Sequence, residues 1–368
     1  MGFEEYQDYY QQGEILLVNN RPEQALLYYE KAEREDPAHP ELYVSKCIAY
    51  VNLDRIEEAE QEAKKALLAD RKHGEAYFHL GCIASLRGSV PEALKNFGLA
   101  ETYGYREAQL YFSQGLMYEE NKDVNMALRN YNKALERNSL RPDVHLRKAQ
   151  LLIDHERRQE ALQSLDQMIL MCPDYFDGYH LKCGVLCSLA RYEEAEQALA
   201  EGKEKFRQDV GFDLDMAKVF VHKGELEKGV AILLALLDDP RARVWKKDIL
   251  MELARIAAQK EDAGKTLFYL EQADAHCRQN GQRDEEVCYL LASAYITQGN
   301  YPKCLDKVQE LMEFGTNVSY NMAAHYYKGV ALQRLGRPDQ AREAYHLAVR
   351  KCRTVSLSAP GAVDSYIF

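Results

Sequence analysis

The chain has 368 residues, of which 46% are hydrophobic and 29% charged, with a formal net charge of −11 at pH 7. This composition is typical of a folded chain and excludes a disordered or fibrous protein. The negative charge opposes the electrostatic attraction to phosphates on which nucleic-acid binding depends, so we expect no nucleic-acid partner.

Small residues recur along the chain with a constant period. One set is spaced by 34 residues, namely Gly13, Cys47, Gly81, Gly115, Ala149, Cys183 and Ala217. A second set follows the first six members by twelve residues, namely Ala25, Ala59, Ala93, Ala127, Ala161 and Ala195. Antiparallel helices approach closely where both carry small side chains, so the two sets predict the crossing point of a repeated helical hairpin.

Turn signals separate the two small positions in most copies. Examples are the segments 19–22, 88–91 and 335–338, which combine Gly or Asn with Pro. Glycine ends a helix and proline is tolerated in the first turn of the next one. Tyr29, Phe97 and Tyr131 recur near the crossing, where we expect them to fill the space beside the small residues.

The segment YYQQGEILLVNNRPEQALLYYEKAEREDP resembles the tetratricopeptide repeat family. Copies without insertion begin at Tyr6, Pro40, Gly74, Ala108, Pro142, Phe176 and Val210, and looser copies begin near Lys247, Glu285 and Met322. The resemblance implies an all-α fold, a right-handed α-α superhelix of about ten helix-turn-helix repeats with twenty helices and no strand. It divides the chain into an extension (1–5), seven contiguous repeats (6–243), three looser repeats (244–355) and a tail (356–368).

The looser copies are separated by insertions of three, four and three residues. The first insertion falls within residues 240–246, near Pro240 and the single tryptophan, Trp245. Two outcomes are open there. The added residues change the pitch of the superhelix, or they lengthen a helix without a hinge.

Nine cysteines are present, and Cys47, Cys183 and Cys304 occupy small-residue positions. They are expected to be buried thiols in a reducing compartment. His180, Cys183 and Cys187 have the spacing to share a metal on one helix, but a fourth ligand is missing, so packing is the preferred explanation. We therefore expect no metal and no other cofactor.

The sequence contains no Gly-x-Ser-x-Gly, His-Glu-x-x-His, Walker or Gly-x-Gly-x-x-Gly pattern, so no enzyme is predicted. The longest apolar run, residues 230–237, is too short to cross a bilayer, and the first residues do not resemble a secretory signal. We expect a cytoplasmic protein without a membrane partner.

In this family, positions five and nine of the first helix in each repeat line the concave groove. Position five is apolar or aromatic in nine of ten copies, which read Tyr10, Val44, Phe78, Phe112, Leu146, His180, Leu214, Met251, Tyr289 and Tyr326. Such a row forms an apolar binding strip if it is open, or ordinary core if the neighbouring first helix covers it.

Copies three to five match the family best, so we predict a peptide-binding groove centred on them. Its members are Tyr10, Val44, Phe78, Cys82, Phe112, Leu116, Leu146, Gln150 and His180. Position two is mostly acidic, with Glu41, Glu75, Asp143 and Asp177 expected to rim the groove and Asp248 and Glu286 continuing the series. Acidic residues in a first helical turn also complement the helix dipole. If they rim the groove, they favour a basic or amphipathic protein segment.

Repeats of this family that bind the acidic C-terminus of heat-shock chaperones use lysines and asparagines at set positions. The first three copies offer Tyr10, Glu14, Ser45, Glu75 and His79 there, so such a partner is not expected. The prediction is a non-catalytic interaction scaffold or adaptor for a protein segment. The alternatives are a self-assembling structural protein that docks its tail, SAPGAVDSYIF, into another copy, and a regulatory subunit of an enzyme complex.

Overall fold

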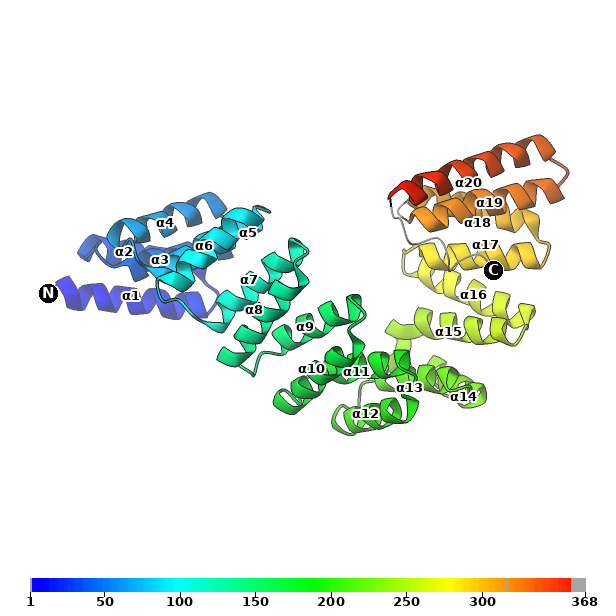
Figure 1. Cartoon of the computed structure of the whole chain (residues 1–368), viewed down its shortest axis with the longest axis horizontal. Helices are drawn as coiled ribbons and strands as arrows, with labels where there is room; N and C mark the ends of the chain where they lie inside the picture. Colours follow the sequence, from blue (N-terminus) through cyan, green and yellow to red (C-terminus); the bar gives the residue numbers. More distant parts are fainter. Residues whose placement is uncertain (1, 316, 359–368) are drawn as a thin grey trace. The chain divides into compact units, whose positions relative to one another are not determined.

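A computed structural model describes the backbone of residues 2–315 and 317–358 and the side chains of residues 4–315 and 317–350. These residues form twenty α-helices and one short 3-10 helix, and they contain no β-strand (Figure 1). Consecutive helices pair as ten antiparallel hairpins, and successive hairpins pack on each other within each of the two units described below. The predicted all-α solenoid is confirmed. The predicted tail falls largely on residues 359–368, which lie outside the described part.

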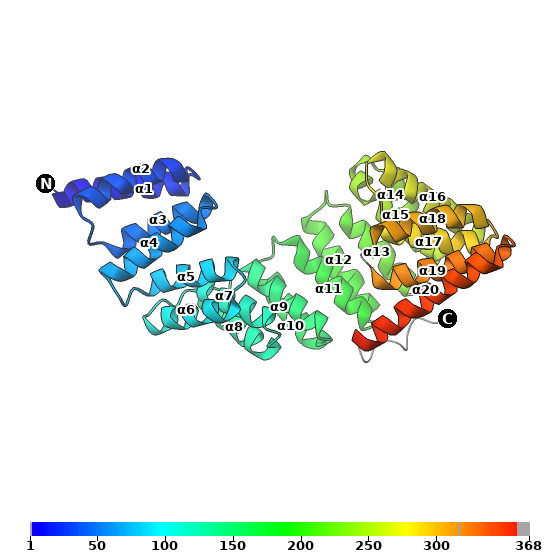
Figure 2. The same cartoon turned by 90° about the horizontal axis from the view of Figure 1, so that it is seen from above.

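The chain divides into two compact units, the first ending at Gly178 and the second beginning at Tyr179. The first unit contains five hairpins (Figure 2). Its helices are α1 (Gly2–Val18), α2 (Pro22–Glu35), α3 (Pro40–Asn52), α4 (Ile56–Ala69), α5 (Gly74–Leu86), α6 (Val90–Thr102), α7 (Ala108–Glu120), α8 (Val124–Arg137), α9 (Pro142–Asp154) and α10 (Arg158–Met171).

The second unit contains the other five hairpins, and its first helix starts just before the boundary. Its helices are α11 (Phe176–Ser188), α12 (Tyr192–Lys205), α13 (Gly211–His222), α14 (Leu226–Leu237), η1 (Pro240–Trp245), α15 (Lys246–Gln259), α16 (Ala263–Gln279), α17 (Glu285–Thr297), α18 (Tyr301–Phe314), α19 (Val318–Arg334) and α20 (Pro338–Ser358).

The crossing inside each hairpin is built as the small-residue pattern predicts. A Cβ atom added to Gly81 would lie 2.5 Å from the ring of Phe97, and one added to Gly329 would lie 2.5 Å from the ring of Tyr345. The aromatic ring therefore occupies the volume that a side chain at the glycine would need. Where position eight is alanine or cysteine, position 24 carries a smaller side chain, as in the pairs Ala149 with Leu165 and Cys47 with Ala63.

Every hairpin turns through one residue in the left-handed conformation, at position fifteen of the repeat. Four are glycines, namely Gly88, Gly224, Gly299 and Gly336, and six are not, namely Asn20, Asp54, Lys122, Glu156, Ala190 and Glu261. This conformation costs a residue with a side chain roughly 1 kcal/mol or more. Because all ten copies adopt it, the turn geometry is set by the helix packing on both sides rather than by the residue in the turn.

The three insertions are accommodated in three different ways. At the first, α14 ends at Leu237 and the added residues form η1, where Asp239 Oδ1 accepts a hydrogen bond from the Arg241 N–H at 2.9 Å. The alternative that the added residues lengthen a helix at this site is therefore wrong. At the second, the added residues do lengthen a helix, since α16 has 17 residues.

At the third insertion α19 begins at Val318, about one turn before the predicted start near Met322. Asn317 explains the earlier start, because its side-chain oxygen accepts hydrogen bonds from the N–H groups of Ser319 and Tyr320 at 2.9 and 3.2 Å. An asparagine that caps the first turn satisfies donors that otherwise lack a partner.

Candidate functional site

The first helices of unit 1 present one common surface, which we call the first-helix face. Val44 and Phe78, at position five, are only 3% and 5% exposed, whereas Tyr10, Phe112 and Leu146 are half-buried. Part of the cover comes from the turn between α6 and α7, where the Tyr105 ring stacks on the Phe78 ring with centroids 4.8 Å apart. Val44 and Phe78 therefore serve the core, and the half-buried members remain candidates for contact with a partner.

In the middle of this face, an arginine neutralises one of the carboxylates of the predicted acidic rim. Asp143 accepts two hydrogen bonds from the Arg141 guanidinium, at 2.8 and 2.6 Å, and this pairing holds the pKa of Asp143 below its usual value. The same guanidinium lies 5.4 Å from the centre of the Phe112 ring. Asp143 is thus an ion-paired member of the predicted acidic rim. Gln150, also predicted to line the groove, donates to Asp154 at 2.7 Å.

The remaining predicted groove positions differ in exposure. Cys82 and Leu116 are half-buried, as is Asp177. His180 belongs to unit 2, where its Nδ1 lies 2.7 Å from Asp215 Oδ2 and its ring stacks on Phe212 at 4.2 Å. Its imidazole is therefore engaged by α13 rather than open to a groove.

A cluster of carboxylates lies on the first-helix face of unit 1. Glu14, Glu41, Glu75 and Glu107 come from four successive repeats or the turns before them. Burial raises the pKa of Glu75, and repulsion from Glu41, Glu14 and Glu107 raises it further, against the opposing effect of His73. The four side chains are therefore near enough to feel each other's charge.

Lysine and arginine do not neutralise this cluster, since none of the four carboxylates forms an ion pair with either within the described residues. The neighbours are histidines: His73 Nε2 lies 3.9 Å from Glu41, and His79 Nε2 lies 4.0 Å from Glu75. Burial lowers the pKa of His79 to about 4, so its ring is neutral at pH 7. The surface beside Tyr10 therefore keeps a negative potential.

Unit 2 contains a half-open cavity of about 780 Å³. Its walls come from α15, α16 and α17, and its lining residues are Met251, Ala254, Arg255, Ala258, Glu261, Ala263, Thr266, Leu270, Glu286, Leu290, Ser293, Ala294 and Thr297. Most of them carry small or apolar side chains. The cavity lies on the same side of the repeats as the predicted groove, because Met251 occupies position five and Glu286 position two.

Two features of the sequence produce this cavity. The four-residue insertion lengthens α16, and α15 and α17 make little direct contact, whereas α17 packs closely on α19. The facing side chains are also small, since Ala258, Ser293 and Ala294 stand where other copies carry larger groups such as Leu17, Leu116 and Met117. Separation of the helices and small side chains together leave the space unfilled.

The charged residues at the rim of the cavity that lack an ion-pair partner are acidic. The Arg255 guanidinium forms an ion pair with Glu252 in the same helix, so its charge is already used. Glu261 and Glu286 make no ion pair or hydrogen bond with another described side chain. Sequence patterns identified Met251 and Glu286, but not the cavity, because its volume depends on how α15, α16 and α17 pack together.

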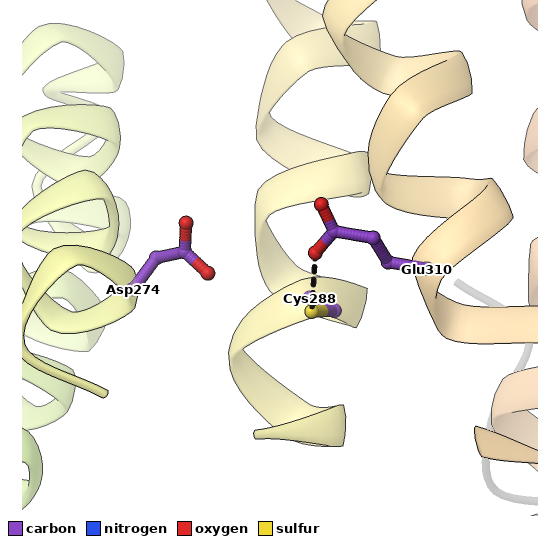
Figure 3. A group of neighbouring side chains, drawn as sticks. All are labelled: Asp274, Cys288 and Glu310. Atoms are coloured by element: carbon purple, nitrogen blue, oxygen red, sulfur yellow. Dashed lines mark hydrogen bonds between the residues drawn. The ribbon is translucent and has the colours of Figure 1, made fainter. Parts of the chain in front are cut away.

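Asp274, Cys288 and Glu310 bring three metal-type ligand atoms within 4.8 Å of one another, the only such group among the residues described (Figure 3). The Cys288 thiol donates to Glu310 at 3.7 Å, and burial raises the pKa of this thiol to about 12. Lys307 bridges the two carboxylates at 2.7 and 3.2 Å, and Arg278 bridges them at 2.9 and 2.6 Å. Two cations balance two carboxylates, so the group is an ion-pair network that offers little attraction to a metal ion.

Unit 1 contains a comparable network in its interior. Lys46, 4% exposed, places its ammonium 2.7 Å from Glu33 and 3.2 Å from Glu62. The acids and the lysine come from α2, α3 and α4, so the network joins the first two hairpins.

The eight cysteines whose side chains are described are free thiols, as expected for small buried residues. None of the described helices combines the length and the apolar character required to cross a bilayer.

Three family models described as tetratricopeptide repeat match residues 16–80, 108–139 and 289–354. The chain is a tetratricopeptide repeat protein. Its matches to curated proteins are 27% identical over 184 residues with human protein O-mannosyl-transferase TMTC3 and 25% identical over 151 residues with anaphase-promoting complex subunit 3 of Schizosaccharomyces pombe. They cover 49% and 41% of this chain, but only 20% and 23% of those proteins, so the repeat protein resembles a minor part of each.

Among solved structures, Pseudomonas aeruginosa pilF has a TM-score of 0.49 and 20% identity, over 59% of this chain and 99% of that one.

Proposed function

We propose that this tetratricopeptide repeat protein is a non-catalytic scaffold that recognises a segment of another protein on its first-helix faces, and that the segment is basic and amphipathic. The observation that supports this most directly is the carboxylate cluster of Glu14, Glu41, Glu75 and Glu107 beside half-buried aromatic side chains. A surface that keeps several uncompensated charges of one sign favours a partner of the opposite sign.

The arrangement supplies the two components of peptide recognition. The carboxylates attract cationic side chains and set their register, while Tyr10 and Phe112, half-buried on the same face, offer apolar contact. Aromatic side chains bury a large area at low cost in rotamer entropy, which suits them to act as anchors. Among the residues whose side chains are described, the face has no nucleophile and base in mutual contact, so none of them points to chemistry on the bound segment.

The experiment is selection of a displayed library of short random peptides on the full chain, followed by affinity measurement with the enriched peptides. We expect enriched sequences that combine lysine or arginine with aromatic or branched aliphatic residues. Glu41→Gln/Glu75→Gln should weaken their binding by about tenfold, because it removes two attractive charges.

The matched control is Glu57→Gln/Glu92→Gln, which makes the same charge change in the first turns of α4 and α6, on the second helices. It should leave binding within about twofold of the parent, because charges there are screened from the first-helix face. Equal losses in both double variants would show a non-specific charge effect. Enrichment of acidic peptides would contradict the proposal outright.

A further inference from the structure

The cavity between α15 and α17 has a more specific consequence, which rests on the proposed function. We propose that it is the anchor pocket of unit 2, filled by one bulky apolar side chain of a partner protein segment that carries a cationic residue on each side of that anchor.

The size of the cavity suits such an anchor. Its volume of about 780 Å³ lies within the range of about 300 to 1,000 Å³ that is usual for binding pockets. An aromatic side chain buries roughly 150 to 250 Å² when it is enclosed. The cavity can therefore take a large side chain together with part of the chain that carries it.

The walls favour an apolar occupant. Met251, Leu270 and Leu290 are hydrophobic, and the two threonines in the lining already use their hydroxyl protons. Thr266 Oγ1 donates to the Asp262 carbonyl at 2.8 Å, and Thr297 Oγ1 donates to the Ser293 carbonyl at 3.1 Å. These hydroxyl groups thus have little to offer a polar ligand as donors, and an apolar side chain leaves no hydrogen bond unmade.

The charges at the rim define the flanking residues. Glu286 lies in the first turn of α17, and Glu261 follows the end of α15. The helices α15 and α17 are both first helices of their repeats, so they run in the same direction. Glu286, at the start of α17, and Glu261, after the end of α15, are therefore expected at opposite ends of the cavity. Met251 and Gln259 are eight residues apart in α15, about 12 Å at the helical rise of 1.5 Å per residue, and Glu261 follows two residues later.

An extended segment covers this length in about four or five residues. The occupant is therefore expected to carry two cations about that far apart with the apolar anchor between them. Arg255 does not reverse this preference, because Glu252 already pairs with it. An acidic segment would face two carboxylates without gaining a free cation.

The test fills the pocket from one wall. Ala258 is exposed on the cavity side of α15, so Ala258→Trp occupies the space without entering the core. Ala275→Trp is the matched control, with the same substitution at an exposed site in α16 outside the cavity lining. Peptides selected from the random library on the full chain serve as the probe.

We expect a class of enriched peptides with the pattern cation, apolar anchor, cation. Ala258→Trp should weaken this class by at least about tenfold, while Ala275→Trp should change it by less than about twofold. Replacing the anchor of such a peptide by alanine should weaken its binding to the parent, with little further loss on Ala258→Trp, because both changes remove the same contact.

The possible failures are distinguishable. If the parent enriches no peptide, the proposed function itself fails. If enriched peptides bind the parent and Ala258→Trp equally, the scaffold function stands and the anchor pocket is refuted. If Ala258→Trp dissolves a dimer in sedimentation, the occupant is a second copy of the chain and the inference is overturned. Circular dichroism checks folding, and Ala258→Leu, a smaller change, replaces the tryptophan variant if helix content falls.

Discussion

Gly115→Ala isolates the packing rule on which the whole fold depends. A Cβ atom at Gly115 would lie 2.6 Å from Cδ1 of Tyr131, about 1 Å closer than an ordinary contact. The ring cannot move aside easily, because it is fully buried, its hydroxyl donates to Glu119 at 2.7 Å, and Phe112 packs beside it with centroids 5.9 Å apart. Overpacking of this kind costs roughly 1 to 3 kcal/mol.

Alanine also gains about 1 kcal/mol over glycine in a helix, so the net loss of unfolding free energy in Gly115→Ala should be up to about 2 kcal/mol. Gly98→Ala is the control, since an added Cβ there meets nothing within 4 Å, and it should stabilise the protein. Urea unfolding followed by circular dichroism measures both.

The double variant Gly115→Ala/Tyr131→Leu reproduces the pair Ala149 with Leu165 found in the next repeat. Because leucine vacates the volume that the new methyl group needs, the double variant should be more stable than the sum of the two single changes predicts, by about 1 kcal/mol or more. If Gly115→Ala is as stabilising as Gly98→Ala, the glycine and the ring do not compete for space and the rule fails.

Three further outcomes follow from the polar groups. Lys46→Met leaves Glu33 and Glu62 without their shared ammonium and should lower the free energy of unfolding by about 3 to 5 kcal/mol at pH 7; a loss below about 1 kcal/mol in urea unfolding would contradict this. The imidazole of His79 should titrate near its lowered pKa of about 4 in an NMR titration. The folded protein should therefore be most stable above about pH 6.5 with respect to this group, and should lose that stability as the pH falls toward 4. A midpoint near 6.5 would show that the ring is solvated. Glu75→Gln should raise the melting temperature at pH 7, because the raised pKa of Glu75 means that its charged form is disfavoured in the folded state, and this gain should vanish in acid below the ordinary pKa of a glutamic acid.

The hairpins were predictable because their determinants are local. Gly81 and Phe97 meet within one repeat, sixteen residues apart, so the pairing of a missing side chain with a large ring can be recognised in the sequence alone. The fixed spacing then repeats this local rule along the chain. It also placed Met251 and Glu286 on first helices of unit 2, where both residues line the cavity.

The fate of the insertions was less predictable, because it depends on which helix the added residues join. The first forms η1 and the second lengthens α16, although both follow second helices of their repeats. The sequence did not predict that Arg141 neutralises Asp143, for a similar reason. Arg141 stands two residues before Asp143, but only the geometry of the turn shows that the two side chains pair and that Glu75 has no such neighbour.

The close packing of α17 on α19 also affects how the array unfolds. In a solenoid each repeat is stabilised mainly by its immediate neighbours, so cooperativity passes along the chain through successive interfaces. Between the ninth and tenth repeats, both α17 and α18 pack closely on α19, so this interface is more extensive than those between the repeats before it. The final two hairpins are therefore expected to exchange their amide protons as a block of their own, and a ligand that bridges α15 and α17 would join this block to the helices before it.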